Sequence, residues 1–504
     1  MKRKAPTSSA DDVEAPVRRK SARLTGSTAP VASATQSSTP SKTATQTKLS
    51  FSPPKPTLAS VSAESTMVAV ASAVRTISAR QATYLRLVSN HLIESKLSPT
   101  ATSAVFITKK LFGVQAQEAL SGFMSIHSRF ARRPTKESPP TTGCVSLEVE
   151  SASTLTALQS LVLSEKTPLV RIWAQRCTLH LFAYDDWHIV SSAFKAKIFA
   201  TRTNSIRLGN VTGKDSSAQF IKAQKAVKEK LERGENVTRK TVEEMGFDGA
   251  LSYSLFMCAT LLRQGSKAEV NAGAAAELKP RYIPEGEEEP HVEMAKDAAL
   301  KEIARRYFEA HGPAQEIDFR YHYDLPAGDS KPAVKHLIDQ GLIQSVVVTP
   351  RTPPPPSAAK LKAKSAGQPT PHYISTTAHN MYLAPIAAPP LPAHPHIPTL
   401  LLSRFDPALL AHKDKSIWVD DDRKYLVWTK NGLINGTVFV DGRVQGTWKV
   451  KYLEGEGGGV GGVRIVVEMF EGVEVGDEVK RDIEEEAERV RAFLDAPKVV
   501  VGYD

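Results

Sequence analysis

Apolar residues recur every three or four positions between residues 75 and 112, which is the spacing of an amphipathic helix. The periodic positions are Tyr84, Leu85, Val88, Leu92, Ala104, Val105, Leu111 and Phe112. The pattern predicts helical structure that leads directly into the segment Leu111–Gln117, which reads Leu-Phe-Gly-Val-Gln-Ala-Gln.

A second helical region follows later in the chain. Its pattern predicts a helix from Phe220 to Leu231, a break at Arg233–Asn236, a short helix from Thr238 to Met245 and a longer helix from Leu251 to Leu262. This order is typical of a helix-turn-helix, in which a helix and a glycine-containing turn are followed by a short helix and a longer helix.

A third region spans residues 292–348. Apolar spacing predicts a helix through Ala299 and Tyr307, and after Gly312-Pro313-Ala314 it predicts a further helix over Val334–Gln340 and a strand over Leu342–Val348. The order of helix, turn, helix and strand indicates a winged helix.

Strand patterns replace helical ones in the last part of the chain. Tyr425–Trp428, Gly436–Val440 and Gly446–Val450 are rich in β-branched and aromatic residues, and the last two flank the tight turn Asp441-Gly442. We expect a β-meander here, followed by a final helix over about Glu478–Leu494.

These patterns predict an α+β fold in six segments. They are a disordered tail at 1–66, a first unit at 75–200 that carries the Gln-x-Gln segment, a second unit at 201–290, a third at 291–349, a Pro- and Lys-rich linker at 350–371, and a β-rich portion with the final helix at 372–504. The tail is rich in Ser, Thr, Ala and Pro and contains one aromatic residue, so it lacks the apolar surface needed to offset the entropy of ordering.

The tail carries two basic clusters, Lys2-Arg3-Lys4 and Arg18-Arg19-Lys20, separated by about a dozen residues. This arrangement is typical of a bipartite nuclear import signal and predicts a nuclear protein. A mitochondrial presequence is the alternative, although acidic residues interrupt the tail and no amphipathic helix is evident.

A short motif further along the tail points to a protein partner. Gln46, Leu49 and Phe51 resemble a degenerate sliding-clamp-binding box, which normally continues with aromatic residues where this chain has Ser52 and Pro53.

Composition and charge narrow the function classes. The chain has 504 residues, of which 41% are hydrophobic, and contains only three widely spaced cysteines, so it suits neither a disulfide framework nor a CxxC metal site. No run of apolar residues is long enough to span a bilayer. The net charge is +11, and residues 59–450 alone hold 48 Lys and Arg against 37 acids. A basic surface of this kind neutralises phosphates and indicates sequence-independent, salt-sensitive affinity for nucleic acid; ordinary solvation of a basic protein is the alternative. The partner that we expect is double-stranded DNA.

Five ordered blocks across residues 75–495 resemble the bacterial winged-helix DNA glycosylases of the AlkZ/YcaQ type. The blocks are Gly113–Gln117, Leu169–Arg176 with Thr178–His180, Gly312–Ala314 with Asp318-Phe319, Phe405-Asp406 with Leu409-Leu410, and Asp441–Val444 with Gly446–Trp448. The resemblance implies three tandem winged helices, so that the first unit is also one, with a concave basic face and a β-rich C-terminal portion. It implies release of N7-alkylated guanines and unhooking of interstrand crosslinks by a monomeric, monofunctional DNA glycosylase.

The resemblance assigns catalysis to Gln115 and Gln117, which match the family's Gln-x-Gln form. An N7-alkylated purine is already cationic and leaves without strong acid help, so neutral amides that orient a water are sufficient. Spacing alone favours two capping or solvated residues. The neighbouring Glu118 has no assigned role, and we expect it to be a surface residue.

Further residues are candidates for DNA contact. Arg176, Thr178 and His180 alternate with apolar residues, so on a strand they share one face. His180 is more typical of a buried core residue than of a catalyst, and the family usually has Gly where this chain has Cys177. Lys413, Lys415 and Arg443 are candidate phosphate contacts, with free surface cations as the alternative.

No cofactor or metal is expected. Gly457–Gly462 satisfies GxGxxG but precedes a strand where a dinucleotide site needs a helix. His372, His379, His394 and His396 lack metal-ligand spacing. Two other functions stay open, namely a non-catalytic winged-helix DNA-binding or chromatin factor and a repair adaptor that acts through its tail.

Overall fold

The computed structural model describes twelve ranges of the chain. They are residues 74–132, 152–163, 168–208, 216–235, 237–247, 251, 277–278, 294–351, 370–384, 390–429, 432–455 and 459–504. The tail with its import signal and clamp-binding motif, and residues 352–369 of the expected linker, lie outside these ranges. Within the described part of the chain, no helix is both long and apolar enough to cross a membrane.

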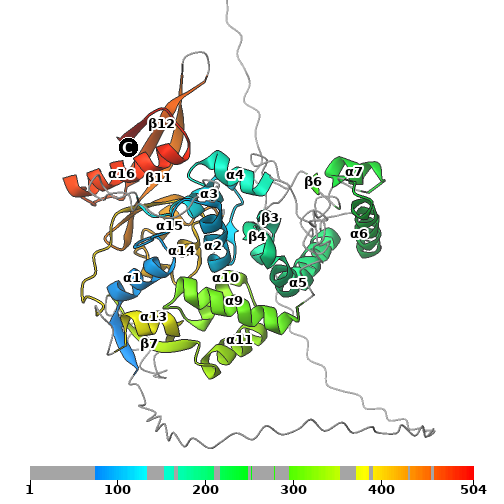
Figure 1. Ribbon diagram of the computed structural model, residues 1–504, viewed down its shortest axis with the longest axis horizontal. Helices are drawn as coiled ribbons and strands as arrows, with labels where there is room; N and C mark the ends of the chain where they lie inside the picture. Colours follow the sequence, from blue (N-terminus) through cyan, green and yellow to red (C-terminus); the bar gives the residue numbers. More distant parts are fainter. Residues whose placement is uncertain are drawn as a thin grey trace, which may run out of the picture. The chain divides into compact units, whose positions relative to one another are not determined.

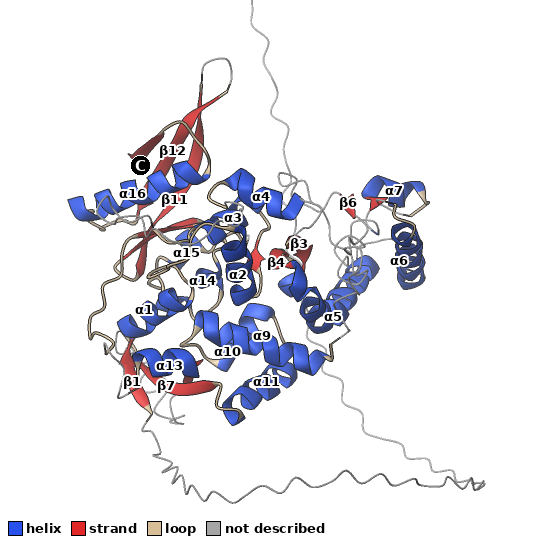
Figure 2. Ribbon diagram, in the orientation of Figure 1, coloured by secondary structure: helices blue, strands red, loops and turns tan. Residues whose placement is uncertain are grey.

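Helices and a small sheet alternate in the first unit (Figures 1 and 2). The elements are α1 (Ala79–Ser89), α2 (Ala101–Leu111), β2 (Val114–Gln115), α3 (Ala119–His127), α4 (Leu155–Leu163), β3 (Leu169–Trp173), β4 (Leu179–Ala183) and α5 (Trp187–Leu208). Two 3-10 turns, η1 (Gln175–Cys177) and η2 (Tyr184–Asp186), flank β4. The sheet order is β2-β4-β3 with antiparallel pairing throughout. The short strand after α2 therefore joins the hairpin that closes the unit.

The second unit begins with the expected helices. It contains α6 (Ser216–Glu232), β5 (Val237–Thr238), α7 (Arg239–Glu244) and β6 (Glu277–Leu278). Thr238 caps α7 by accepting a hydrogen bond from the backbone N–H of Thr241, which explains why the helix restarts there. β5 pairs antiparallel with β6. The expected helix over Leu251–Leu262 lies outside the described residues except for Leu251.

In the described residues, the third unit consists of three helices, two strands and a short helix. It contains α9 (Lys296–His311), α10 (Glu316–Tyr323), α11 (Ala327–Asp339), β7 (Ile343–Thr349), β8 (His372–Ser375) and α13 (Thr376–Tyr382). Ala314, after α9, forms a bridge with Tyr373 of β8. β7 also pairs in parallel with β1 (Arg75–Ser78), which precedes α1. The start of the expected first unit is thus joined to the third.

The C-terminal portion is a five-stranded sheet with the order β13-β12-β11-β10-β9. Its elements are β9 (Leu400–Leu402), α14 (Pro407–Leu410), η4 (Lys415–Ile417), α15 (Lys424–Val427), β10 (Gly436–Val440), β11 (Arg443–Glu454), β12 (Val460–Met469), α16 (Asp477–Phe493) and β13 (Val499–Tyr503). The strands expected at Gly436–Val440 and Gly446–Val450 and the final helix are confirmed.

The strand expected at Tyr425–Trp428 is wrong, because Lys424–Val427 form the short helix α15. Both edges of β10 are already occupied, by β9 and β11, so the sheet offers this segment no place beside β10. The segment instead buries Val427 and leaves Tyr425 exposed.

Candidate active site

The Gln-x-Gln segment lies at the end of α2. Phe112 and Gly113 adopt left-handed conformations with φ of 45° and 99°, which end the helix and turn the chain into β2. A Cβ atom on Gly113 would lie 2.6 Å from the Phe182 ring, so only glycine fits this turn. In β2, Gln115 is paired with His180 of β4.

Arg171 of β3 holds the backbone of the segment in place. Its Nε donates to the carbonyl oxygen of Ala116 at 2.9 Å, and its Nη2 donates to that of Gln117 at 3.3 Å. The side chain is only 2% exposed, and burial lowers its pKa to about 10. The role of Arg171 was not predicted from the sequence, although a charged residue in a strand otherwise made of buried apolar residues was the available signal.

Each glutamine is held through its side-chain oxygen. Gln115 is 7% exposed, and its Oε1 accepts a hydrogen bond from Nη2 of Arg176. Gln117 is half-buried, and its Oε1 accepts from the backbone N–H of Leu179 at 3.2 Å. Neither residue is therefore the freely solvated polar side chain that spacing alone favours.

Arg176 and Thr178 do not lie on a strand, so the expected alternating strand face is wrong. Arg176 belongs to the turn η1, while Thr178 precedes β4. The turn contains two consecutive non-glycine residues in the left-handed region, Arg176 with φ 54° and Cys177 with φ 52°. The left-handed geometry at Cys177 is the one that the glycine expected there would adopt without strain.

His180 lies on β4, as expected, but inside the protein. It is 2% exposed, its Nδ1 is 2.9 Å from the carbonyl oxygen of Thr178, and burial with the nearby Arg176 lowers its pKa to about 3. The ring is therefore neutral at physiological pH. His180 lies opposite Gln115 on the neighbouring strand and is not exposed on the surface where DNA would bind.

Polar atoms without partners surround Arg176 and His180. His322 of α10 is buried, and neither of its ring nitrogens has a hydrogen-bond partner among the described residues. The same holds for Nε of Arg176 and for both amide atoms of Gln175. Burial, together with His311, Arg176, His180 and Lys415, keeps the pKa of His322 well below its usual value.

The three candidate phosphate contacts differ in exposure. Lys413 is exposed, and its backbone N–H donates to Asp318 at 2.9 Å. Lys415 is 8% exposed, its Nζ donates to the carbonyl oxygens of Leu409 and His412, and burial lowers its pKa to about 7. Arg443 is also buried and binds Ser416 and Asp420. Of these three, only Lys413 is free to meet a phosphate without rearrangement.

Glu118 is a surface residue in the structure. Its carboxylate binds Arg404 at 2.9 Å and Ser121 at 3.1 Å. In the part of the chain that the structure describes, no three His, Cys, Asp or Glu side chains gather in a way that would hold a metal ion.

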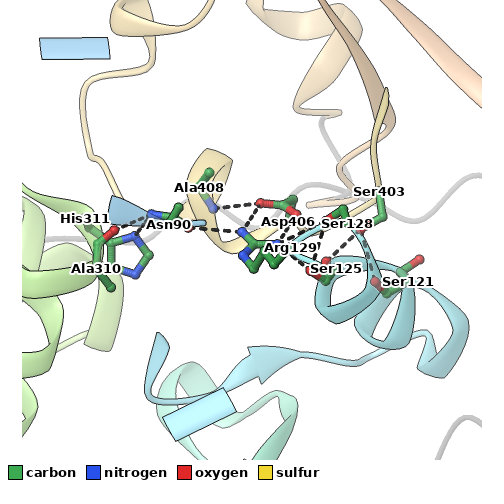
Figure 3. A network of polar contacts seen from close by, with 10 residues as sticks. All are labelled: Asn90, Ser121, Ser125, Ser128, Arg129, Ala310, His311, Ser403, Asp406 and Ala408. Atoms are coloured by element: carbon green, nitrogen blue, oxygen red, sulfur yellow. Dashed lines mark hydrogen bonds and ion pairs between the residues drawn. The ribbon is translucent and has the colours of Figure 1, made fainter. Parts of the chain in front are cut away.

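A second buried polar cluster lies around Arg129, just after α3 (Figure 3). Arg129 binds both carboxylate oxygens of Asp406, at 3.0 and 2.9 Å, and also Asn90, which in turn contacts His311. Asp406 caps α14 through the backbone N–H of Ala408. This cluster joins α1, α3, α9 and α14, and both its ionic partners are fully buried.

Comparison with known proteins gives one family and one solved structure. The family described as DNA glycosylase AlkZ-like matches residues 151–493. The structure of the Streptomyces sahachiroi DNA glycosylase AlkZ is similar to this chain with a TM-score of 0.58 and 19% identity, covering 85% of this chain and 100% of that protein. No curated protein matches the sequence.

Proposed function

The chain belongs to the AlkZ-like DNA glycosylase family, and we propose that it hydrolyses the N-glycosidic bond of N7-alkylated purines in duplex DNA. We place Gln115 and Gln117, which precede the matched residues 151–493, at the reacting nucleotide. We include N7-linked interstrand crosslinks among the substrates. The chemistry needs a positioned water and stabilisation of a cationic sugar while the base departs.

Three repeats of one element order support a scaffold of tandem winged helices. Each repeat starts with a helix, continues through a short strand or bridge and further helical structure, and ends with a strand that pairs with that short strand or bridge. The pairs are β2 with β4, β5 with β6, and Ala314 with Tyr373. Winged helices bind DNA by placing a helix in a groove, and three in series provide a long surface for duplex DNA.

The observation that carries the proposal is the restraint on the Gln-x-Gln segment. A buried arginine fixes its backbone, and protein donors fix both side-chain amides. Preorganised polar groups at a reacting centre lower the barrier because they need no reorganisation during the reaction. Amides remove no proton, so the pair suits a base that is already positively charged when it leaves.

The test is release of the modified base by purified full-length protein. Duplex DNA with one N7-methylguanine is incubated with the protein, and abasic sites are measured above the level without protein. We expect wild-type protein to form abasic sites and the double variant Gln115→Ala/Gln117→Ala to be slower by about 100-fold or more. Glu118→Gln is the matched control, because it changes the adjacent exposed carboxylate, and it should keep wild-type activity.

Two results would reject the proposal. The first is the absence of abasic sites with folded wild-type protein, which favours a non-catalytic DNA-binding role. The second is a double variant as active as wild type, which would move catalysis away from the Gln pair.

A further inference from the structure

The orientation of the Gln115 amide is fixed by the chemistry of its partner. A guanidinium has only N–H donors and no acceptor. The atom of Gln115 that faces Nη2 of Arg176 must therefore be its oxygen, and the amide nitrogen is turned away. Rotation of the amide by 180° would bring two sets of donors together inside the protein.

The amide nitrogen is the end of Gln115 that stays available. It has no hydrogen-bond partner among the described residues. Because it is also not among the fully buried side-chain atoms that lack a partner there, it is accessible to solvent. The two N–H groups of this nitrogen are therefore the part of the Gln115 side chain that can donate hydrogen bonds to a ligand.

Arg176 lies in a strained turn and is largely shielded from solvent. Its turn places two consecutive residues in the left-handed region. Its guanidinium is desolvated and lies near Tyr321, Tyr323 and Asp324, with desolvation lowering its pKa. Strained backbone of this kind persists where the surrounding structure over-determines it, and it is frequent at functional sites.

We infer that Gln115 acts as a hydrogen-bond donor to an acceptor atom of the lesion nucleotide, and that Arg176 is the positioning residue that sets this polarity. The acceptor belongs either to the purine or to a phosphodiester of the same nucleotide. The inference rests on the proposed glycosylase function and adds one contact to it, a hydrogen bond from the Gln115 amide nitrogen to the nucleotide.

Single-turnover release of N7-methylguanine separates the donor role from an acceptor role. Gln115→Met removes donor and acceptor at nearly constant volume, whereas Gln115→Glu keeps an acceptor and removes the donor. We expect both variants to be about 100-fold slower, as for loss of one preorganised donor. An unchanged or faster Gln115→Glu, with a carboxylate pKa appearing in its pH-rate profile, would overturn the inference.

Arg176 variants test the positioning role. Arg176→Met frees the amide to turn and should slow the single-turnover rate by about tenfold, in the range for one hydrogen bond to a charged group. Arg176→Lys keeps a donor and should restore most of that loss, with the effect in kcat and not in KM. If Arg176→Met matches wild type in rate, Arg176 does not position Gln115.

Binding measurements identify the acceptor and use no turnover. One duplex carries 2′-fluoro-N7-methylguanosine, which resists hydrolysis, and the other carries a tetrahydrofuran abasic analogue with the same phosphates. A base acceptor predicts that Gln115→Met weakens binding to the first duplex alone, and a phosphodiester acceptor predicts equal weakening on both. No weakening on either duplex would contradict a donor contact in the bound state. Inactive wild-type protein would instead reject the proposed function.

Discussion

Two arginines of this protein, the fully buried Arg129 and the half-buried Arg176, occupy opposite kinds of surroundings. Arg129 uses both terminal nitrogens on Asp406, Asn90 and the backbone of Ser125, and Asp406 uses both of its oxygens (Figure 3). Arg176 makes one side-chain hydrogen bond among the described residues, to Gln115, and has no carboxylate partner there. The Nε atoms of both arginines are buried without a partner among the described residues.

The contrast is between a cluster that holds the fold together and the cluster that we propose contacts the nucleotide. Buried polar groups are almost always paired, so unpaired ones in a folded protein need an explanation. Around Arg129 the terminal guanidinium nitrogens and both carboxylate oxygens of Asp406 are paired and join helices far apart in sequence, whereas Nε of Arg129 and Nε2 of His311 have no partner among the described residues. Around Arg176 the unpaired groups include His322 and Gln175, and the backbone is strained. Local departures from ideal pairing are expected where function is located.

The largest effect is expected from breaking the paired cluster. Asp406→Ala leaves the Arg129 guanidinium buried without its counter-charge and removes the cap of α14, so we expect a loss of about 3–5 kcal/mol in the free energy of unfolding. Urea unfolding of the full chain measures it. Molecules that remain folded should keep their glycosylase rate.

Removing both partners is the control for this prediction. Arg129→Met with Asp406→Ala eliminates the orphaned charge, and it should be less destabilising than the sum of the two single variants. Strict additivity, or a single Asp406→Ala that costs under about 1 kcal/mol, would show that this pair does not hold the helices together.

The second effect concerns Lys415, whose buried amine contributes to the pKa depression of His322. Burial lowers its pKa from 10.5 to about 7 in the folded protein, so the unfolded chain binds more protons between these values. Stability from this group therefore rises from pH 7 to 10.5, by at most about 1.4 kcal/mol per pH unit. Below pH 7 the charged amine is a constant penalty.

Lys415→Met removes this titration. The difference in unfolding free energy between wild type and variant, measured in urea at pH 7 and pH 9, should shift in favour of wild type at the higher pH. A difference that stays constant between the two pH values would mean that Lys415 is not desolvated in the folded protein.

Much of the fold was predictable because it depends on local sequence. Periodic apolar residues located α1, α2, α6, α9 and α16, and the Asp441-Gly442 turn located the β10–β11 hairpin. The prediction of a strand at Tyr425–Trp428 was wrong because a segment can join a sheet only where an edge is free, and the tertiary structure decides which edges are free. The pairing of β1 with β7 joins residues far apart in sequence, so no local sequence pattern predicts it.

The candidate site was predictable only in part. Gln115 and Gln117 were identified by a resemblance, since two polar residues after a helix carry no signal by themselves. Arg171 was missed because its role depends on carbonyl groups of Ala116 and Gln117, which follow β2 and are distant from Arg171 in the sequence. The burial of Lys415 and Arg443 was unexpected because lysine and arginine side chains are rarely buried. Their hydrogen-bond partners are visible only in the three-dimensional structure.

The smallest effect is expected from relieving backbone strain at the turn beside Gln115. Cys177 has φ 52°, a conformation that costs a non-glycine residue roughly 1–2 kcal/mol and glycine almost nothing. Part of this gain is offset by the greater freedom of glycine in the unfolded chain and by the lost contact of the thiol with the core. Cys177→Gly should therefore stabilise the protein by about 1 kcal/mol and leave base release unchanged. Arg176→Gly relieves the same kind of strain but removes the donor to Gln115, so it should lower base release even if the protein becomes no less stable. Equal activity in the two glycine variants would mean that the strained turn serves the fold alone, and the distinction between the two arginine clusters would then fail.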